Sequence, residues 1–256
     1  MRGTIYKQWF VNRDIYVYLP PSYESNSAAA YPVVYIQDGD YLIMGAAEQL
    51  EERFDRGVLQ ELILVGIEPI DRNDEYTPWY TDPISDRFPT PCQGQGETYL
   101  RFVVEQLKPY IDGACRTKRE PEATGIAGAS YGGLITIYAA YLFPEVFGRF
   151  GLLSASFWYE GMIEYVSSHP IPSNDKRLFM YVGSEEGAGK TTIQMHMVPY
   201  TREAHQQFLA GGFPGKSMKF VEEPGGVHTH EFFIKYFPDA MEWLYPGTDE
   251  TRNPRE

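Results

Sequence analysis

Hydrophobic runs and polar turns alternate along the chain in a way that predicts an α/β protein. Two alternating segments, 4–11 and 15–19, flank the polar residues 12–14, which predicts an antiparallel hairpin. Continuous apolar runs, typical of strands covered on both faces, follow at 32–37, 62–67, 123–127, 150–153, 178–182 and 218–221. Helical spacing occurs at 46–54, 97–111, 134–143, 196–209 and 232–244. We therefore expect a mostly parallel central sheet with an N-terminal antiparallel hairpin and helices on both faces.

Length and composition narrow the class of protein. A chain of 256 residues with 43% hydrophobic residues is expected to form one domain over 1–256. The chain shows no apolar run of membrane-spanning length and no secretion signal at its start, so we expect a cytoplasmic location and no membrane partner. Cys92 and Cys115 are then expected as free thiols. The net charge of -13 argues against a nucleic-acid partner, because phosphates repel an acidic surface.

Residues 68–95 form the one long stretch without a regular pattern, and they are rich in Pro, Asp, Arg and Tyr. A loop of this length in a compact domain is usually functional. Its aromatic residues Tyr76, Trp79 and Tyr80 are therefore candidates for a substrate cleft.

The segment 128–133 reads Gly-Ala-Ser-Tyr-Gly-Gly and lies between an expected strand and an expected helix. This is the pattern of a nucleophile elbow, in which a sharp turn exposes a serine, here Ser130. The N-terminus of the following helix favours the negative charge of a tetrahedral intermediate. The pattern is weak alone, because Ser130 also needs a base and an acid.

The acid is expected at the carboxyl end of a later parallel strand, where functional groups gather in such sheets. The strand at 178–182 is followed by Glu185 and Glu186. Either carboxylate could orient a histidine, and Glu186 is the preferred candidate. No group of residues in the chain has the pattern of a metal or cofactor site.

The base is expected after the strand at 218–221, which is followed by His228 and His230. His228 is preferred because it comes first after a glycine turn, whereas His230 has the position of a helix start. Serine, acid and histidine then follow in the chain order of α/β-hydrolases. Because a protonated imidazole cannot accept a proton, activity should decline as the pH falls through about 6 to 7.

Several motifs in a fixed order resemble the esterase family of α/β-hydrolases, which groups esterase D, enterochelin-esterase-like siderophore hydrolases, feruloyl and acetylxylan esterases and mycolyltransferases. The motifs lie at 17–23, 31–35, 124–134, 144–148 and 154–159, and the likeness continues to His228. The resemblance implies an α/β-hydrolase fold and an esterase that needs no cofactor.

The resemblance also implies roles for particular residues. It places the nucleophile at Ser130, the histidine at His228 and the acid at Glu186. It places the oxyanion-binding backbone N–H groups at Tyr131 and Asp40. The carboxylate of Asp40 would then lie near the mouth of the site and disfavour strongly anionic acyl groups.

Residues 72–79 resemble the Arg-x-x-Glu-Tyr-Thr-Pro segment of the enterochelin-esterase-like branch. We expect Arg72, Tyr76 and Trp79 to border the substrate, together with Trp158 from the 154–159 motif. The alternative is that Arg72 pairs with Glu75 and only braces the loop.

We expect a serine carboxylic-ester hydrolase that acts on a small-molecule ester through an acyl-enzyme. A siderophore trilactone, helped by arginines such as Arg72 and Arg87, and small aryl or acyl esters are both candidate substrates. An acyltransferase and a non-catalytic binding module on the same fold are the alternatives. The oligomeric state is left open.

Overall fold

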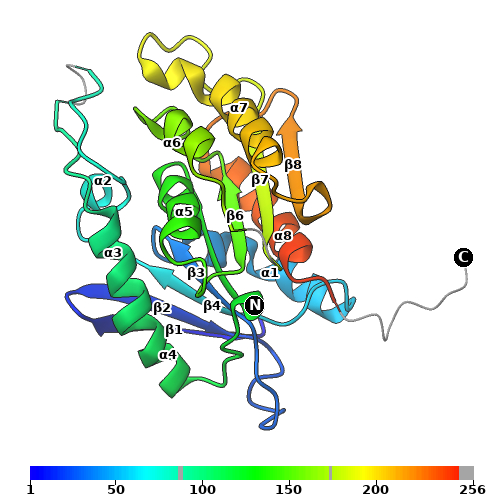
Figure 1. The fold of residues 1–256 in the computed structure, drawn as a ribbon. Coiled ribbons are helices and arrows are strands. Elements are labelled where there is room, and N and C mark those ends of the chain that lie inside the picture. The colour runs from blue at the N-terminus through cyan, green and yellow to red at the C-terminus, as the bar shows by residue number, and fades with distance from the viewer. Residues whose placement is uncertain (86–88, 173–174, 248–256) are drawn as a thin grey trace, which may run out of the picture.

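An eight-stranded sheet forms the centre of the protein, in the order β1-β2-β4-β3-β5-β6-β7-β8 (Figure 1). The computed structural model describes residues 1–85, 89–172 and 175–247; Arg87 lies outside these ranges. The strands are β1 (Thr4–Phe10), β2 (Arg13–Leu19), β3 (Val33–Gln37), β4 (Ile63–Ile67), β5 (Thr124–Ala129), β6 (Arg149–Leu153), β7 (Arg177–Gly183) and β8 (Met218–Glu223). β1 and β2 form the expected antiparallel hairpin, β2 pairs antiparallel with β4, and the strands from β4 to β8 are parallel. This is the α/β-hydrolase architecture.

Helices cover both faces of the sheet, as the alternating pattern predicts. One face carries α1 (Tyr41–Asp55) and α8 (His230–Leu244). The other face carries α3 (Gly96–Phe102), α4 (Lys108–Ala114), α5 (Tyr131–Leu142), α6 (Met162–Ser168) and α7 (Met197–Ala210). Short 3-10 turns lie at Pro121–Ala123, Ile193–His196 and Gly215–Ser217.

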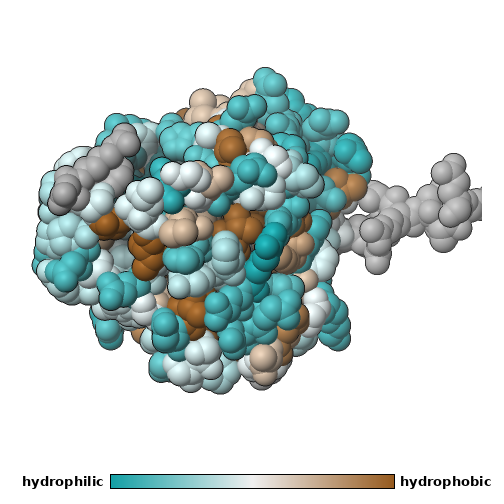
Figure 2. Space-filling view, turned by 90° about the horizontal axis from the view of Figure 1, so that it is seen from above, coloured by the Kyte–Doolittle hydropathy of each residue, from teal (hydrophilic) through white to brown (hydrophobic). Residues whose placement is uncertain are grey.

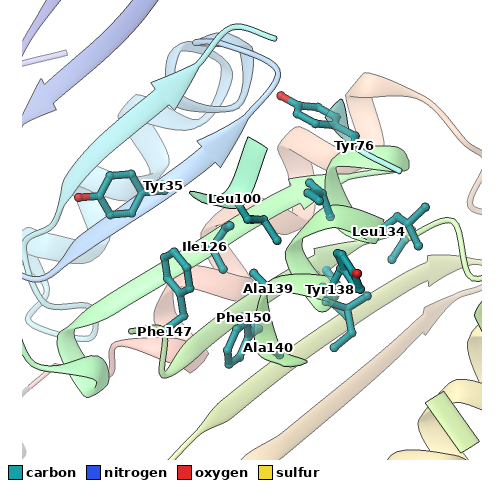
Figure 3. Close-up of a cluster of buried hydrophobic side chains, with 14 of the residues drawn as sticks. Tyr35, Tyr76, Leu100, Ile126, Leu134, Tyr138, Ala139, Ala140, Phe147 and Phe150 are labelled. Atoms are coloured by element: carbon teal, nitrogen blue, oxygen red, sulfur yellow. The ribbon is translucent and has the colours of Figure 1, made fainter. Parts of the chain in front are cut away.

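Strand residues alternate between two hydrophobic clusters, one on each face of the sheet. In β3, Val33 and Tyr35 belong to the cluster under α5, whereas Val34 and Ile36 pack against α1 and α8. Figure 3 shows the first cluster, in which Leu134 and other residues of α5 lie over the central strands. These contacts hold α5, and the turn before it, firmly against the sheet.

The structure differs from the sequence-based expectation at three helices. The helix expected at 97–111 extends over 96–114. Within it, five π-helical residues, Val103–Leu107, connect α3 to α4. The short helices α2 (Arg72–Glu75) and α6 were not expected. α2 has four residues, too few to show helical periodicity, and the Asp71 side chain caps it by accepting the N–H groups of Asn73 and Asp74.

Two further expectations concern the cysteines and the membrane. Cys92 and Cys115 are both buried free thiols, as predicted. Among the residues that the structure describes, no helix has both the length and the apolar character required to cross a bilayer.

Candidate active site

Ser130 lies between β5 and α5 in a backbone conformation that side-chain-bearing residues rarely adopt, with φ 58° and ψ -121°. Neighbouring backbone holds it there. The N–H of Ser130 donates to the carbonyl of Leu153 (3.0 Å), and the N–H of Ser156 donates to the carbonyl of Ser130 (3.2 Å). A strained, well-supported serine at a strand-to-helix turn is the geometry of a nucleophile elbow.

The glycines of the elbow are required by close packing. A Cβ at Gly128 would lie 2.5 Å from the backbone of Gly132. A Cβ at Gly132 would lie 2.9 Å from the Cβ of Gln37, at the end of β3. Larger residues would therefore push the turn away from the sheet and displace Ser130.

Glu186 and His228 form a short hydrogen bond at the carboxyl ends of β7 and β8. His228 Nδ1 lies 2.6 Å from Glu186 Oε2. The other oxygen, Oε1, accepts the hydroxyl of Ser154 (2.6 Å) and the N–H of Gly183 (2.9 Å). Glu186 is only 4% exposed, so these donors compensate the buried charge. A proton on Nδ1 leaves His228 Nε2 free to accept one.

The alternatives to these two residues make different contacts. Glu185 is exposed, and its Oε1 accepts the hydroxyl of Ser184 (3.4 Å). His230 begins α8 and stacks on Tyr41, with ring centroids 4.5 Å apart. Folding thus brings Glu186, and not Glu185, to His228.

Among the described residues, two cavities of different size adjoin Ser130. The larger, of about 490 Å³, is lined by Tyr41, His228, His230 and Phe233 among others. The smaller, of about 170 Å³, is lined by Cys92, Tyr131, Trp158 and Gln194 among others. Ser130 and Arg72 line both, and the Ser130 hydroxyl lies 3.5 Å from that of Ser156. Figure 2 views the end of the molecule toward which β6 and β8 point, where apolar side chains lie exposed among hydrophilic ones.

Arg72 borders both cavities and forms a bidentate ion pair with Asp38. The distances are 2.6 Å from Nε to Oδ1 and 3.0 Å from Nη2 to Oδ2. Burial alone would lower the pKa of Arg72, but the hydrogen bonds and charge of Asp38 raise it overall. Glu75 pairs with Arg13, so the alternative of an Arg72 to Glu75 brace is wrong and two separate pairs form.

The other expected substrate contacts differ in their positions. Trp158 is buried and lines the smaller cavity. Tyr76 is 0% exposed, and its hydroxyl accepts the N–H of Asp38 (3.0 Å), so it offers no surface to a ligand. Trp79 lines neither cavity, because its indole N–H donates to the carbonyl of Glu160 (2.8 Å) and its ring packs on tyrosines.

Two backbone amides remain free beside the elbow. Within the described part of the chain, the N–H groups of Tyr131 and Asp40 donate to no protein acceptor, whereas that of Gly39 donates to Ile67 (2.9 Å). Tyr131 is the first residue of α5, and Asp40 is the residue that precedes α1. The carboxylate that lines the larger cavity is that of Asp38, not that of Asp40 as expected.

Sequence reasoning missed two residues that support this site. Ser154 directly follows β6, and its hydroxyl fixes Glu186. A polar residue at the end of a buried strand was the signal that would have identified it. Asp38, at the end of β3, carries the same signal.

Comparisons with known proteins assign the chain to a family. A family model described as "Putative esterase" matches residues 11–244. The uncharacterized protein YbbA of Bacillus subtilis (strain 168) is 42% identical over 245 residues, 96% of this chain and 97% of that protein. An iron(III) enterobactin esterase of Escherichia coli O6:H1 is 25% identical over 146 residues, 54% of this chain but 33% of that protein.

Solved structures share the fold at low sequence identity. An IroE-like serine hydrolase from Shewanella oneidensis has a TM-score of 0.76 at 21% identity, over 95% of this chain and 80% of that one. The siderophore hydrolase EstA from Aspergillus nidulans has a TM-score of 0.69 at 21% identity, over 94% of this chain and 92% of that one. With the family model matching most of the chain, these findings show that the protein belongs to the esterase family and is a hydrolase enzyme with the α/β-hydrolase fold.

Proposed function

We propose that the protein hydrolyses small carboxylic esters through an acyl-enzyme, with Ser130 as nucleophile, His228 as base and Glu186 as the carboxylate that orients His228. The observation that carries this proposal is the 2.6 Å contact between Glu186 and His228, whose ring faces the same cavity as Ser130. The order of the three residues along the chain also supports it.

In the first step, Ser130 Oγ forms a bond to the ester carbonyl carbon while His228 Nε2 takes the hydroxyl proton. The carbonyl electrons move onto oxygen, and the free N–H groups of Tyr131 and Asp40 stabilise that negative charge. Glu186 stabilises the imidazolium. The carbon–oxygen bond to the alcohol then breaks, and the alcohol leaves with the proton from His228.

In the second step, water attacks the acyl-enzyme. His228 accepts the water proton, the tetrahedral intermediate collapses, and Ser130 Oγ recovers a proton as the carboxylic acid departs. No metal or cofactor takes part in either step. Solved structures of this fold include siderophore hydrolases, so a trilactone siderophore belongs in the substrate panel beside simple esters.

The first test of this proposal is Ser130→Ala. Without the attacking hydroxyl, kcat/KM for 4-nitrophenyl acetate should fall at least about 10³-fold. Ser167→Ala, on the exposed side of α6, is the matched control and should retain wild-type activity. A fluorophosphonate probe should label the wild type and not Ser130→Ala. Retention of more than a tenth of the activity by Ser130→Ala would overturn the assignment.

Two neighbouring glutamates test the identity of the acid. Glu186→Gln removes the buried charge with little change of shape and should lower kcat by about 10³ to 10⁴-fold. Glu185→Gln changes an exposed side chain and should lower it less than about twofold. The reverse order would assign the role to Glu185.

A further inference from the structure

The two cavities at Ser130 differ in size and in which catalytic group they reach. The larger cavity, of about 490 Å³, contains His228, whereas the lining of the smaller one, of about 170 Å³, does not include it. The two halves of an ester therefore meet different surroundings at the same nucleophile.

The path of the proton from His228 determines which half of the ester lies in which cavity. This inference rests on the acyl-enzyme mechanism proposed above. The leaving oxygen must receive its proton from His228, so the alcohol has to lie on the side of that imidazole. That side is the larger cavity. The remaining substituent of the carbonyl carbon, the acyl group, is then directed to the smaller cavity, beside Tyr131 and Trp158.

The volume of the smaller cavity limits the acyl group. A protein cavity of about 150 Å³ holds one benzene ring. The smaller cavity is close to that size, and Ile84, Cys92 and Trp158 provide apolar walls. It therefore has room for a single ring or a short chain, and a longer acyl group would have to extend out of it.

The charge of the lining limits the acyl group further. Among the described residues that line the smaller cavity, Arg72 is the one that carries a charge, and its Nε and Nη2 both bond to Asp38. The pair is neutral as a unit, so it offers little net attraction to an anion. An uncharged acyl group fits these surroundings better than a carboxylate.

We propose that the smaller cavity is the acyl site and that the enzyme prefers esters of a compact, uncharged acid with a larger alcohol. The alcohol lies among the aromatic rings of Tyr41, His230 and Phe233 in the larger cavity. The cavities thereby set opposite size limits on the two halves of the substrate.

Two ester series measure these limits in the wild type. Acyl length varies from acetate to decanoate with 4-nitrophenol as the alcohol, and alcohol size varies from methyl to 2-naphthyl with acetate as the acid. We expect kcat/KM to fall at least about tenfold between butyrate and decanoate. The naphthyl ester should be hydrolysed at least as efficiently as the methyl ester.

Matched tryptophan variants assign each cavity. Gln194→Trp narrows the smaller cavity from a half-buried position, and His230→Trp narrows the larger one. Gln194→Trp should lower the butyrate-to-acetate ratio of kcat/KM about tenfold. His230→Trp should lower the naphthyl-to-methyl ratio of kcat/KM about tenfold. Each ratio compares two substrates with the same variant. A lower folded fraction of that variant would reduce both apparent kcat/KM values equally and leave the ratio unchanged. Asn73→Trp, at an exposed position on the smaller cavity, is the second variant should Gln194→Trp not fold.

The outcomes separate this inference from the proposed function. If the two variants exchange their effects, the acyl group lies in the larger cavity and the inference is wrong. If neither ratio changes, the cavities do not hold the substrate and the inference also fails. In both cases Ser130→Ala would still abolish hydrolysis. Full activity of Ser130→Ala would instead contradict the proposed function itself.

Discussion

The two ends of helix α2 each carry half of an arginine–carboxylate pair, and the two pairs lie in different surroundings. Arg72 pairs with Asp38 at 2.6 Å beside the cavities, and Glu75 pairs with Arg13 at 2.7 Å inside the core. Their contact distances are similar. Their exposure is not, since the side chains of Arg72 and Asp38 are 39% and 17% exposed, against 6% and 12% for Arg13 and Glu75.

From this difference we expect one end of a four-residue helix to serve stability and the other to serve ligand recognition. The Arg13 guanidinium lies 4.3 Å from the ring of Phe102, and Glu75 also accepts the N–H of Ile70 (3.0 Å). Water cannot easily replace a missing partner there, so that pair holds the helix in place. The pair at Arg72 is partly exposed beside both cavities, so we expect it to act on substrate selectivity.

The largest expected effect comes from breaking the core pair. Glu75→Gln leaves the charge of Arg13 buried without a carboxylate, which should lower the free energy of unfolding by about 3 to 5 kcal/mol. Urea denaturation followed by circular dichroism measures this loss.

Two controls decide whether burial is the cause. Replacing both partners, Arg13→Met with Glu75→Leu, should recover much of the stability, because no unpaired charge remains. Glu97→Gln removes a partner of Arg101 from a pair in which both side chains are 53% exposed, and should change stability by about 0.5 kcal/mol or less. Equal losses for Glu75→Gln and Glu97→Gln would contradict the comparison.

Glu51 is a third buried carboxylate to set beside Glu75. Its carboxylate accepts hydrogen bonds mainly from uncharged donors. It accepts the N–H groups of Arg2 and Gly3 at 2.8 Å and the hydroxyl of Tyr18 at 3.1 Å. Burial alone would raise the pKa of Glu51, but these hydrogen bonds lower it overall. Glu51→Gln should cost about 1 to 3 kcal/mol at neutral pH.

The sign of the pH dependence follows from that lowered pKa. The folded state binds the Glu51 proton less tightly than the unfolded state. The stabilisation by the ionised carboxylate is therefore fully present at pH values above the ordinary pKa of glutamate. It is lost as the pH falls through the lower pKa of the folded state. The difference in urea midpoint between wild type and Glu51→Gln should therefore shrink below about pH 4. A difference that grows in acid would contradict this explanation.

The smallest effect is expected at the Arg72–Asp38 pair beside the cavities. Asp38→Asn releases Arg72 from its carboxylate, so the kcat/KM ratio of 4-nitrophenyl hemisuccinate to 4-nitrophenyl butyrate should rise about fivefold, the equivalent of about 1 kcal/mol. Glu97→Gln makes the same charge change far from the site and serves as control. An unchanged ratio in Asp38→Asn would show that the pair does not set charge selectivity.

Local patterns were sufficient to predict the fold and the elbow. The two hydrophobic periods are properties of neighbouring residues, which is why the hairpin and the order of strands and helices were anticipated. The conformation of Ser130 also depends on glycines within two positions of it. The roles of Ser130, Glu186 and His228 remain predictions, and the structure adds the contact between the last two.

Contacts between distant segments were not predictable in the same way. Tyr76 and Trp79 were expected at the substrate because they lie in a long loop that resembles the enterochelin-esterase-like branch. The structure adds that their polar atoms bind backbone groups of other segments. Arg72 and Glu75 are neighbours on one turn, but the sheet places Asp38 and Arg13 closer to their charges.

Periodicity and the spacing of small residues around Ser130 were enough to predict the class of fold and a candidate nucleophile, because both act over a few residues of chain. The contact between Glu186 and His228, the partner of Arg72 and the two unequal cavities required the folded protein. These features arise where the ends of β3, β5, β7 and β8 meet, and side chains from segments remote in sequence compete there for the same space and the same charges.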